Sequence, residues 1–425
     1  MAQTNKHRFS RRGMLQITGG LAVAGAAGGI TATVYGEDGA GAAETGTGTG
    51  TGTGGTAAKR TFQHPGMLHS YGELNRAKVR VQAGTRPWTA GWQRLVANPH
   101  AQSTWKPRAT ATVIRGGAGQ NYPQLYRDVH AAYQNALRWK IAGTKEHGDT
   151  ARDILNAWSG TLKTLTGNAD RFLAAGIYGY QFANAAELMR DYPGFDLARF
   201  QKMLLTVFHP MSEDFLTRHN DANIQNYWAN WDLCNMASIM AIGILCDDTA
   251  KFQRAVEYFK NGAGNGSIKN AVPFLHADGL GQWQEAGRDQ GHTVMGIGLM
   301  GAVCEMAWNQ GVDLYGYDDN RFMKGAQYAA KYNLGGDVPF TKYAWRTGTG
   351  RGAHREQTVV SAPGRGQIRP VWELVHNHYA KRRRLSVPYI TAMAEKVRAE
   401  GGGGDYGPNS GGFDQLGFGT LLYSR

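Results

Sequence analysis

The sequence predicts one large all-α domain. Apolar residues recur at positions i, i+3, i+4 and i+7 through most of the chain after residue 59, which is the spacing of the buried face of a helix. Few stretches alternate as a strand does, and no linker-like segment interrupts the interior of the chain. With 42% hydrophobic and 11% aromatic residues over 425 positions, the chain has ample material for a large core.

The expected helices follow one another with breaks that are rich in glycine, proline and asparagine. We predict helices within residues 125–137, 151–165, 172–189, 197–216, 231–245, 249–259, 294–308, 321–332, 369–379 and 389–398. Asp149 or Thr150 is expected to cap the second of these helices, and Asp248 or Thr249 the sixth. Three glycine-rich segments are expected to be loops, where function often resides: residues 115–120, 348–366 and 401–412.

The N-terminal residues predict export. Ser10-Arg11-Arg12-Gly13 is a twin-arginine pattern, and a run of small and apolar residues follows it to about Val34. We assign residues 1–43 to a twin-arginine export signal rather than a membrane anchor, because the run is rich in glycine and alanine and only moderately hydrophobic. Threonine and glycine alternate within residues 44–58, which we expect to be a flexible linker. Residues 59–425 are the expected folded domain of a periplasmic or secreted protein.

The charge balance favours an acidic partner. Lysine and arginine number 46 against 33 aspartates and glutamates, and the sequence pI is about 9.6. Four basic and three acidic residues precede Ala58, so a formal charge of +12 belongs to the folded part. Such a charge attracts nucleic acid, anionic lipid or a polyanionic substrate. Three cysteines without a Cys-x-x-Cys pair give neither a disulfide scaffold nor a zinc or redox motif, and we expect no metal and no cofactor.

One segment brings three ionisable side chains into register. Glu285, Arg288 and His292 lie at i, i+3 and i+7, so a helical path would align a carboxylate, a guanidinium and an imidazole on one face. The same residue types also suit a structural Glu–Arg pair with Asp289 as a helix cap. The spacing is not that of a His-Glu-x-x-His zinc motif.

A second segment combines amides with aromatic rings. Asn223, Asn226 and Asn230 would share one face of a helix, with aromatic residues between them. Sugar rings stack on aromatic faces, and amides bind hydroxyl and carboxylate groups. The candidate binding residues in this segment are Asn226, Tyr227, Trp228, Asn230 and Trp231. A helix N-terminus with asparagine caps and core aromatics is the alternative interpretation.

Two further segments carry basic residues. The stretch 340–355 holds several lysines, arginines and histidines among glycines, with Tyr343 near its start. It is either a flexible cationic loop that clamps an anionic chain or a solvated basic loop. His376 and His378 lie two residues apart on an expected helix, where they point in different directions, so a metal pair is not favoured.

Five ordered blocks of the sequence together resemble the alginate-lyase-like superfamily. They are Asn230–Leu233, Glu285-x-x-Arg288-Asp289-Gln290-Gly291-His292, Asn309–Tyr315, Lys331–Pro339 and Asn377–Tyr379. The chain is most similar to polysaccharide lyase family 38, from about residue 74 to the C-terminus. The resemblance implies an (α/α) toroid of six or seven helical hairpins and cleavage of alginate or β-1,4-glucuronan. His376 stands where many relatives have a tyrosine, so no role is assigned to it.

The chemistry that the resemblance implies is β-elimination. A base removes the C5 proton, which lies α to the uronate carboxylate, an acid protonates the leaving O4, and positioned donors stabilise the developing charge. His292 is the expected base because imidazole side chains commonly abstract protons near neutral pH. Tyr343 is the expected acid and Tyr227 the second choice. The groups expected to neutralise the carboxylate are Arg288 with a protonated Glu285, or the amides of Asn226 and Asn230.

The resulting hypothesis is a polysaccharide lyase that takes an anionic polysaccharide, with neither nucleic acid nor a membrane as a lasting partner after export. Further substrate contacts are expected from Gln290, Arg346, Arg351, Asn377 and His378. Two alternatives stay open. One is an α/α-barrel glycoside hydrolase that uses Glu285 with Asp289 or Glu373. The other is a non-catalytic binder of anionic polysaccharide. Mannuronate, guluronate and glucuronate differ only in stereochemistry, and the sequence does not choose among them.

Overall fold

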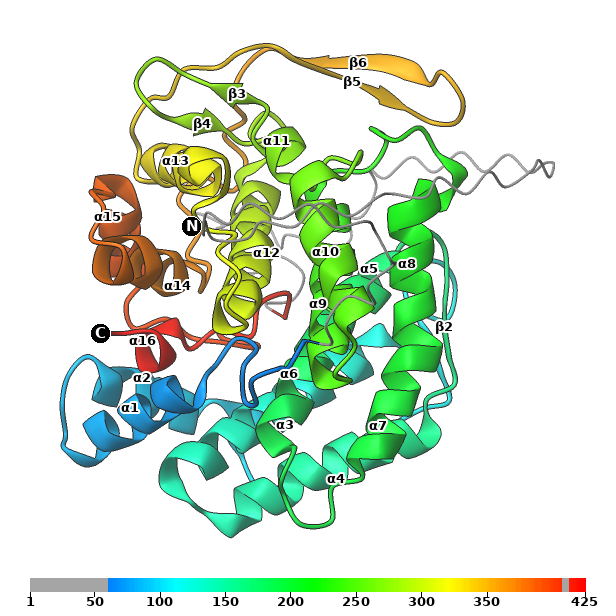
Figure 1. Ribbon diagram of the computed structural model, residues 1–425, viewed down its shortest axis with the longest axis vertical. Helices are drawn as coiled ribbons and strands as arrows, with labels where there is room; N and C mark the ends of the chain where they lie inside the picture. Colours follow the sequence, from blue (N-terminus) through cyan, green and yellow to red (C-terminus); the bar gives the residue numbers. More distant parts are fainter. Residues whose placement is uncertain (1–59, 407–412) are drawn as a thin grey trace, which may run out of the picture. The chain divides into compact units, whose positions relative to one another are not determined.

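A computed structural model describes residues 60–406 and 413–425 of the chain (Figure 1). The predicted export signal and linker, residues 1–43 and 44–58, lie outside the described residues. The α-helices are α1 (Tyr71–Gln82), α2 (Trp88–Ala97), α3 (Tyr122–Ala142), α4 (Lys145–Thr161), α5 (Arg171–Leu173), α6 (Gly179–Met189), α7 (Leu197–Met203), α8 (His209–Arg218), α9 (Ala229–Leu245), α10 (Thr249–Asn261), α11 (Ile268–Ala271), α12 (Gln290–Asn309), α13 (Tyr317–Asn333), α14 (Trp372–His376), α15 (Pro388–Val397) and α16 (Gly419–Leu422). Short 3-10 turns are η1 (Pro99–Ala101) and η4 (His219–Asp221), and π-helical turns are η2 (Ala174–Tyr178), η3 (Leu204–Phe208) and η5 (Asn377–Arg382). The strands are β1 (Thr112–Ile114), β2 (Thr164–Thr166), β3 (Phe274–Leu275), β4 (Gly281–Gln282), β5 (Tyr343–Thr347) and β6 (Ala353–Gln357).

Consecutive helices pack as pairs, and the first helix of each pair also packs against the first helix of the next. The pairs include α3 with α4, α9 with α10, α12 with α13 and α14 with α15. The inner contacts run from α3 to α6, from α6 to α9, from α9 to α12 and from α12 to α14. This alternation of inner and outer helices is the predicted (α/α) toroid, and Figure 1 shows several of the pairs. Because each inner helix is followed by a returning outer helix, the inner helices run in the same direction.

The inner and outer helices differ in sequence as their positions require. Helices α9 and α12 bury nearly all their residues, as expected of helices that are apolar on every side. The outer helix α10 buries only a stripe that contains Phe252, Val256 and Phe259, and it leaves its charged face in solvent. No helix in the described part of the chain is long and apolar enough to cross a bilayer.

The helix predictions are confirmed, with differences at the ends. The side chain of Asp248 accepts a hydrogen bond from the backbone N–H of Lys251 at 3.1 Å, so it is the predicted cap. The prediction of Asp149 or Thr150 as a cap is wrong, because helix α4 begins at Lys145. The Thr150 hydroxyl instead hydrogen-bonds the carbonyl of Glu146 one turn earlier, at 2.9 Å. Helix α1 was not predicted, although its capping box, formed by Ser70 and Glu73, is a readable signal.

The two ends of the described chain meet and close the ring of helices. Arg76 Nε donates to the carbonyl of Ser424 at 3.0 Å, and the guanidinium of Arg425 pairs with Glu73 at 3.0 Å. Arg382 bridges Glu73 and the fully buried Glu305. Because each buried carboxylate has a guanidinium partner, the charges are compensated at the point where the toroid closes.

The segment 340–355, expected to be a flexible loop, forms most of a β-hairpin. Strand β5 pairs antiparallel with β6, and Tyr343 lies opposite Gln357. Buried or half-buried Tyr343, Trp345 and Thr347 alternate with exposed Ala344 and Arg346, as in a half-buried strand. The glycines between β5 and β6 form the turn that connects the two strands. The alternation of buried and exposed residues along β5 was the sequence signal that the loop prediction missed.

Candidate active site

Helix α12 begins just after the three ionisable side chains were expected to align on a helix. Asp289 is its N-cap, and the Asp289 carboxylate accepts a hydrogen bond from the backbone N–H of His292 at 2.8 Å. Glu285 and Arg288 lie in the tight turn before this cap. The path through Glu285 and Arg288 is therefore not helical, and the alternative interpretation of Asp289 as a helix cap is confirmed, because the aspartate side chain competes for the backbone donors and starts the helix later.

The turn nevertheless brings the three side chains together. One guanidinium nitrogen of Arg288 donates to Glu285 Oε1 at 2.9 Å, and the other approaches Nε2 of His292 at 3.2 Å. Nδ1 of His292 lies 2.7 Å from Asp289 Oδ2. Since a guanidinium only donates, Nε2 is the acceptor and Nδ1 carries the proton. We call Glu285, Arg288, Asp289 and His292 the Arg288 cluster.

The pKa values of the two carboxyl groups in the Arg288 cluster are shifted in opposite directions. Glu285 is fully buried, and its Oε2 has no hydrogen-bond partner among the described residues. Burial raises the pKa of Glu285 above its usual value, although Arg288 opposes this. Burial alone would also raise the pKa of Asp289, but the hydrogen bonds and charge of His292 hold it below its usual value. Carboxylates whose pKa values are pushed apart suit different roles in proton chemistry.

Tyr343 is attached to this cluster through the neighbouring Gln284. The Tyr343 hydroxyl accepts a hydrogen bond from Gln284 Nε2 at 3.0 Å and donates one to Asn265 Oδ1 at 3.3 Å. Burial raises the pKa of Tyr343 to about 12; the hydrogen bond from Gln284 opposes the rise, and the charge of Glu285 adds to it. The phenol is therefore protonated at neutral pH and able to act as an acid.

Two tryptophans connect Tyr343 with Arg288. The guanidinium of Arg288 lies 5.0 Å from the ring centre of Trp228. Trp345 packs against Trp228 with ring centres 5.0 Å apart and lies nearly parallel to Tyr343 at 5.8 Å. Trp345 was not among the predicted site residues, although its position two residues after Tyr343 puts both rings on the same face of β5.

The predicted row of asparagines is divided between a turn and a helix. Helix α9 begins at Ala229, so Asn223 and Asn226 precede it, and the expectation of one helical face is wrong. Asn226 Oδ1 accepts a hydrogen bond from the backbone of Gly348 at 2.7 Å, so this side chain holds the tip of the β5–β6 hairpin. Asparagine side chains often bind backbone groups in this way, in competition with helix formation.

Asn230 differs from the other asparagines because its amide is buried and nearly unused. It lies in the first turn of α9, and its Oδ1 has no partner among the described residues. Its Nδ2 has only a long contact of 3.9 Å with the sulfur of Met295, one turn beyond the first residues of α12. A buried amide without partners is costly unless a ligand completes its hydrogen bonds.

Tyr227 and Trp231 pack together beside this helix start. Their ring centres are 4.6 Å apart, and both rings also lie against Phe215. The Tyr227 hydroxyl accepts a hydrogen bond from Asn220 at 2.9 Å. Neither ring has a hydrogen bond to the Arg288 cluster, so this pair forms an apolar support for the loop that carries Trp228.

Gln290 is fully engaged inside the protein. Its side-chain amide donates to the carbonyl of Ser361 at 2.9 Å and accepts from Asn333 Nδ2 at 2.9 Å. It therefore fixes the segment that follows β6 rather than presenting a free amide. Arg346 and Arg351 are exposed, and strand alternation puts Arg346 on the face of β5 opposite Tyr343.

The expected substrate contacts at Asn377 and His378 lie elsewhere in the structure. Asn377 donates to Glu373 at 2.8 Å, and the ring of His378 stacks on Tyr315 with ring centres 3.6 Å apart. His378 also packs against Trp308, which lies sixteen residues after His292 on α12, or about 24 Å along that helix. Burial lowers the pKa of His378 to about 2. The structure does not bring these two residues to the Arg288 cluster.

One arginine that precedes an inner helix was not among the predicted site residues. Arg115 precedes α3, donates to the Tyr178 hydroxyl at 3.0 Å and lies 5.0 Å from the ring centre of Tyr122. Within residues 60–406 and 413–425 it has no carboxylate partner at ion-pair distance. Its only signal in the sequence was its position at the start of the glycine-rich segment 115–120.

Comparison with known proteins gives one family and a set of related folds. The family model described as alginate lyase matches residues 91–339, which include the Arg288 cluster and end just before Tyr343. No curated protein matches the sequence. Alginate lyase A1-III from Sphingomonas species A1 is 16% identical with a TM-score of 0.51, covering 88% of this chain and all of that one. A variant of alginate lyase A1-III complexed with a tetrasaccharide is also 16% identical, covers 85% of this chain and 95% of that one, and has a TM-score of 0.51. An alginate lyase from Bacteroides ovatus is 14% identical, covers 63% and 83% of the two chains, and has a TM-score of 0.47.

Proposed function

We propose that the Arg288 cluster and Tyr343 cleave a β-1,4-linked polyuronate, because the chain belongs to the alginate lyase family and is therefore a polysaccharide lyase. The observation that carries this assignment is the pair of contacts by which Arg288 joins a buried carboxyl group and an imidazole. A protonated phenol, Tyr343, is hydrogen-bonded to Gln284, the residue before that carboxyl group in the chain. This set supplies a carboxylate binder, a base and an acid.

Arg288 and Glu285 are suited to hold the substrate carboxylate. The guanidinium binds carboxylates through parallel N–H donors. Burial raises the pKa of Glu285, which makes its protonated form more accessible, and its Oε2 has no partner among the described residues. It can therefore donate a hydrogen bond to the same carboxylate. These donors stabilise the charge that develops on the carboxylate when the C5 proton leaves.

His292 is suited to remove the C5 proton. With Nδ1–H donated to Asp289, the lone pair of Nε2 is the only basic position on the ring. Arg288 occupies that lone pair when no substrate is bound. A uronate carboxylate that draws the guanidinium toward itself frees Nε2 for the proton, so substrate binding and activation of the base are linked. Asp289 then stabilises the imidazolium ion.

Tyr343 is suited to protonate the leaving O4. The C5–H and C4–O4 bonds break, a C4=C5 double bond forms, and O4 takes a proton from the phenol. The Gln284 amide, which already donates to this hydroxyl at 3.0 Å, stabilises the resulting phenolate. The raised pKa of Tyr343 keeps the proton in place until O4 develops negative charge.

Ultraviolet absorbance over time tests this function. The full chain is given polymannuronate, polyguluronate and β-1,4-glucuronan in separate reactions. A rise on at least one polymer is expected, because elimination leaves a double bond conjugated with the carboxylate, and the responding polymer identifies the uronate. Polymer shortening without a rise in absorbance would instead support a hydrolase.

We also propose that residues 1–43 direct export by the twin-arginine route, with residues 44–58 as a linker to the domain 59–425. The Ser10-Arg11-Arg12-Gly13 pattern supports this. Replacing both arginines of the pattern with lysine should leave the protein inside the cell, as measured by fractionation. Unchanged export of this variant would overturn the proposal.

A further inference from the structure

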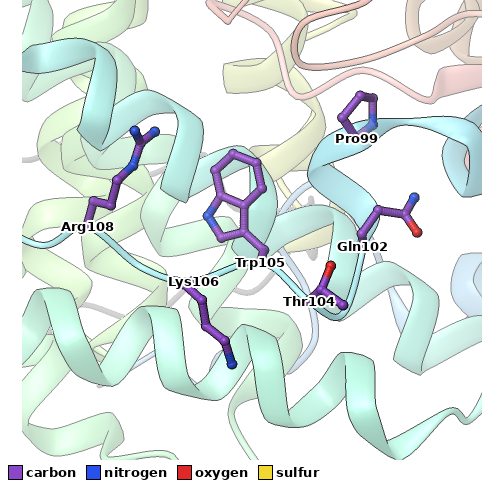
Figure 2. A pocket seen from close by; sticks show the side chains of 6 residues that line it. All are labelled: Pro99, Gln102, Thr104, Trp105, Lys106 and Arg108. Atoms are coloured by element: carbon purple, nitrogen blue, oxygen red, sulfur yellow. The ribbon is translucent and has the colours of Figure 1, made fainter.

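A groove of about 470 Å³ lies on the segment between α2 and β1, before the first inner helix (Figure 2). It is lined by Pro99, Gln102, Thr104, Trp105, Lys106 and Arg108. It is a shallow groove open to solvent rather than an enclosed cavity. No hydrogen bond, ion pair or ring contact of the described residues joins these side chains to the Arg288 cluster, so the groove is a separate feature.

The centre of the groove is an oriented tryptophan. Trp105 Nε1 donates to Asp128 Oδ1 at 2.9 Å, and His100 packs against the indole with ring centres 4.7 Å apart. Asp128 is fully buried and also accepts from Trp158 Nε1 at 2.8 Å. These contacts fix the plane of the indole while part of Trp105 stays exposed. A fixed, partly exposed indole is a platform on which the C–H face of a sugar ring can pack.

The groove is lined by two cationic side chains, Lys106 and Arg108. Lys106 and Arg108 are exposed, and neither forms an ion pair within the described residues. The nearby Asp128 carboxylate accepts hydrogen bonds from two indoles and from the backbone N–H of Arg108 at 2.6 Å, and it is not at ion-pair distance from the Arg108 guanidinium. Burial, with the charges of Arg127 and Arg108, lowers the pKa of His100 to about 4. Burial is the main cause of this shift, and the two guanidinium charges add to it.

We propose that this groove is a second binding site for a uronate-bearing saccharide, separate from the Arg288 cluster. The sugar ring packs on Trp105, and its carboxylate pairs with Lys106 or Arg108. Figure 2 shows Arg108 on one side of the indole, with Gln102 and Thr104 on the other. The Gln102 amide nitrogen is bound to the carbonyls of residues 96 and 98, which leaves its oxygen and the exposed Thr104 hydroxyl for sugar hydroxyls.

The identity of the ligand rests on the proposed function, because the occupant is taken to be another stretch of the substrate polymer. A chain held at the groove increases the local concentration of its own remaining length at the Arg288 cluster. This gain requires a polymer long enough to reach both places. Short oligosaccharides, which occupy one place at a time, do not benefit from it.

The test uses two full-length variants with equal changes in net charge. Lys106→Glu with Arg108→Glu removes the groove cations. Lys78→Glu with Lys202→Glu changes two exposed lysines on α1 and α7 and is the matched control. All four side chains are exposed, so both variants should fold, and circular dichroism checks this. The expected result is a KM for the long polyuronate raised about tenfold or more in the groove variant only. Its kcat/KM on a tetrasaccharide of the same uronate should be unchanged.

An unchanged polymer KM in the groove variant, or an equal rise in the control, would overturn the proposal. Calorimetric titration of the same variants with the polymer separates this failure from failure of the proposed function. If no polyuronate is cleaved but the groove variant alone loses affinity for polymannuronate, the result supports the binding site at the groove and contradicts the proposed lyase reaction. A neutral mannan should bind neither variant nor the native chain at this site, and mannan binding that matches polymannuronate binding would also contradict the proposal.

Discussion

Replacing Tyr343 with phenylalanine removes one hydroxyl and keeps the ring. That hydroxyl accepts from Gln284 and donates to Asn265, and both partners are buried. The ring keeps its near-parallel contact with Trp345, at 5.8 Å between ring centres. The substitution therefore separates the chemistry of the phenol from the packing of the β5–β6 hairpin.

The expected effect on rate is much larger than the effect on stability. Loss of a general acid costs about 10²- to 10⁴-fold in kcat. Leaving two buried polar groups without a partner costs about 1–3 kcal/mol of the free energy of unfolding, which a domain of this size tolerates. Because the pKa of Tyr343 is raised to about 12, the phenol is protonated across the neutral range, and the native enzyme should lose no activity through its ionisation below about pH 10.

The assay is ultraviolet absorbance on the responding polyuronate, with urea unfolding of the same preparations. Tyr227→Phe is the matched control, because it also removes a tyrosine hydroxyl with a single amide partner, Asn220. The control should keep kcat within about threefold of the native chain. If Tyr343→Phe keeps more than a third of the native kcat, Tyr343 is not the acid. If Tyr227→Phe alone loses activity, that role belongs to Tyr227.

Substitutions at three further residues test the other assignments. His292→Ala should lower kcat by about 10²-fold or more with an unchanged helical circular-dichroism signal, and retained turnover would remove it as the base. Glu285→Gln, which imitates the protonated carboxyl group, should keep kcat within about tenfold, whereas Glu285→Ala should lose far more. Since the folded-state pKa of Glu285 is raised, its contribution to stability is complete below its ordinary pKa and is lost as the pH rises through the raised value. Urea unfolding of Glu285→Gln between pH 4 and 8 should therefore show a smaller fall in stability than the native chain, and an equal fall would contradict the raised pKa. His378→Ala should lower the free energy of unfolding by about 1–3 kcal/mol through loss of its stacking on Tyr315 and leave KM unchanged; a raised KM with native stability would return His378 to the substrate site.

Much of the helical architecture could be read from the sequence because inner and outer helices have distinct patterns. Helix α9 is apolar on every side, and α10 carries a single stripe that includes Phe252 and Val256. The β5–β6 hairpin was missed because its period of two extends over only five residues per strand, beside glycines that resemble a loop. Helix α1 was missed because it buries few apolar residues.

Part of the candidate active site could also be predicted from local sequence patterns. Glu285, Arg288 and His292 meet because a tight turn leads directly into α12, so local spacing was informative even though the path is not helical. His378 was predicted as a substrate contact, but it packs near Trp308, far along α12 from the Arg288 cluster. The sequence does not show which end of α12 a residue from another helix contacts. Trp345 reaches Trp228 only through tertiary packing of the hairpin, which no local pattern encodes.

The central claim is that the Arg288 cluster and Tyr343 break the polymer by elimination. Mass spectrometry of the products of the native chain tests this most directly, because an eliminated chain end is lighter by one water molecule than a hydrolysed end. The account predicts that every new non-reducing end lacks that water, and that His292→Ala and Tyr343→Phe form such ends far more slowly. New ends that carry the full mass of hydrolysis would contradict it.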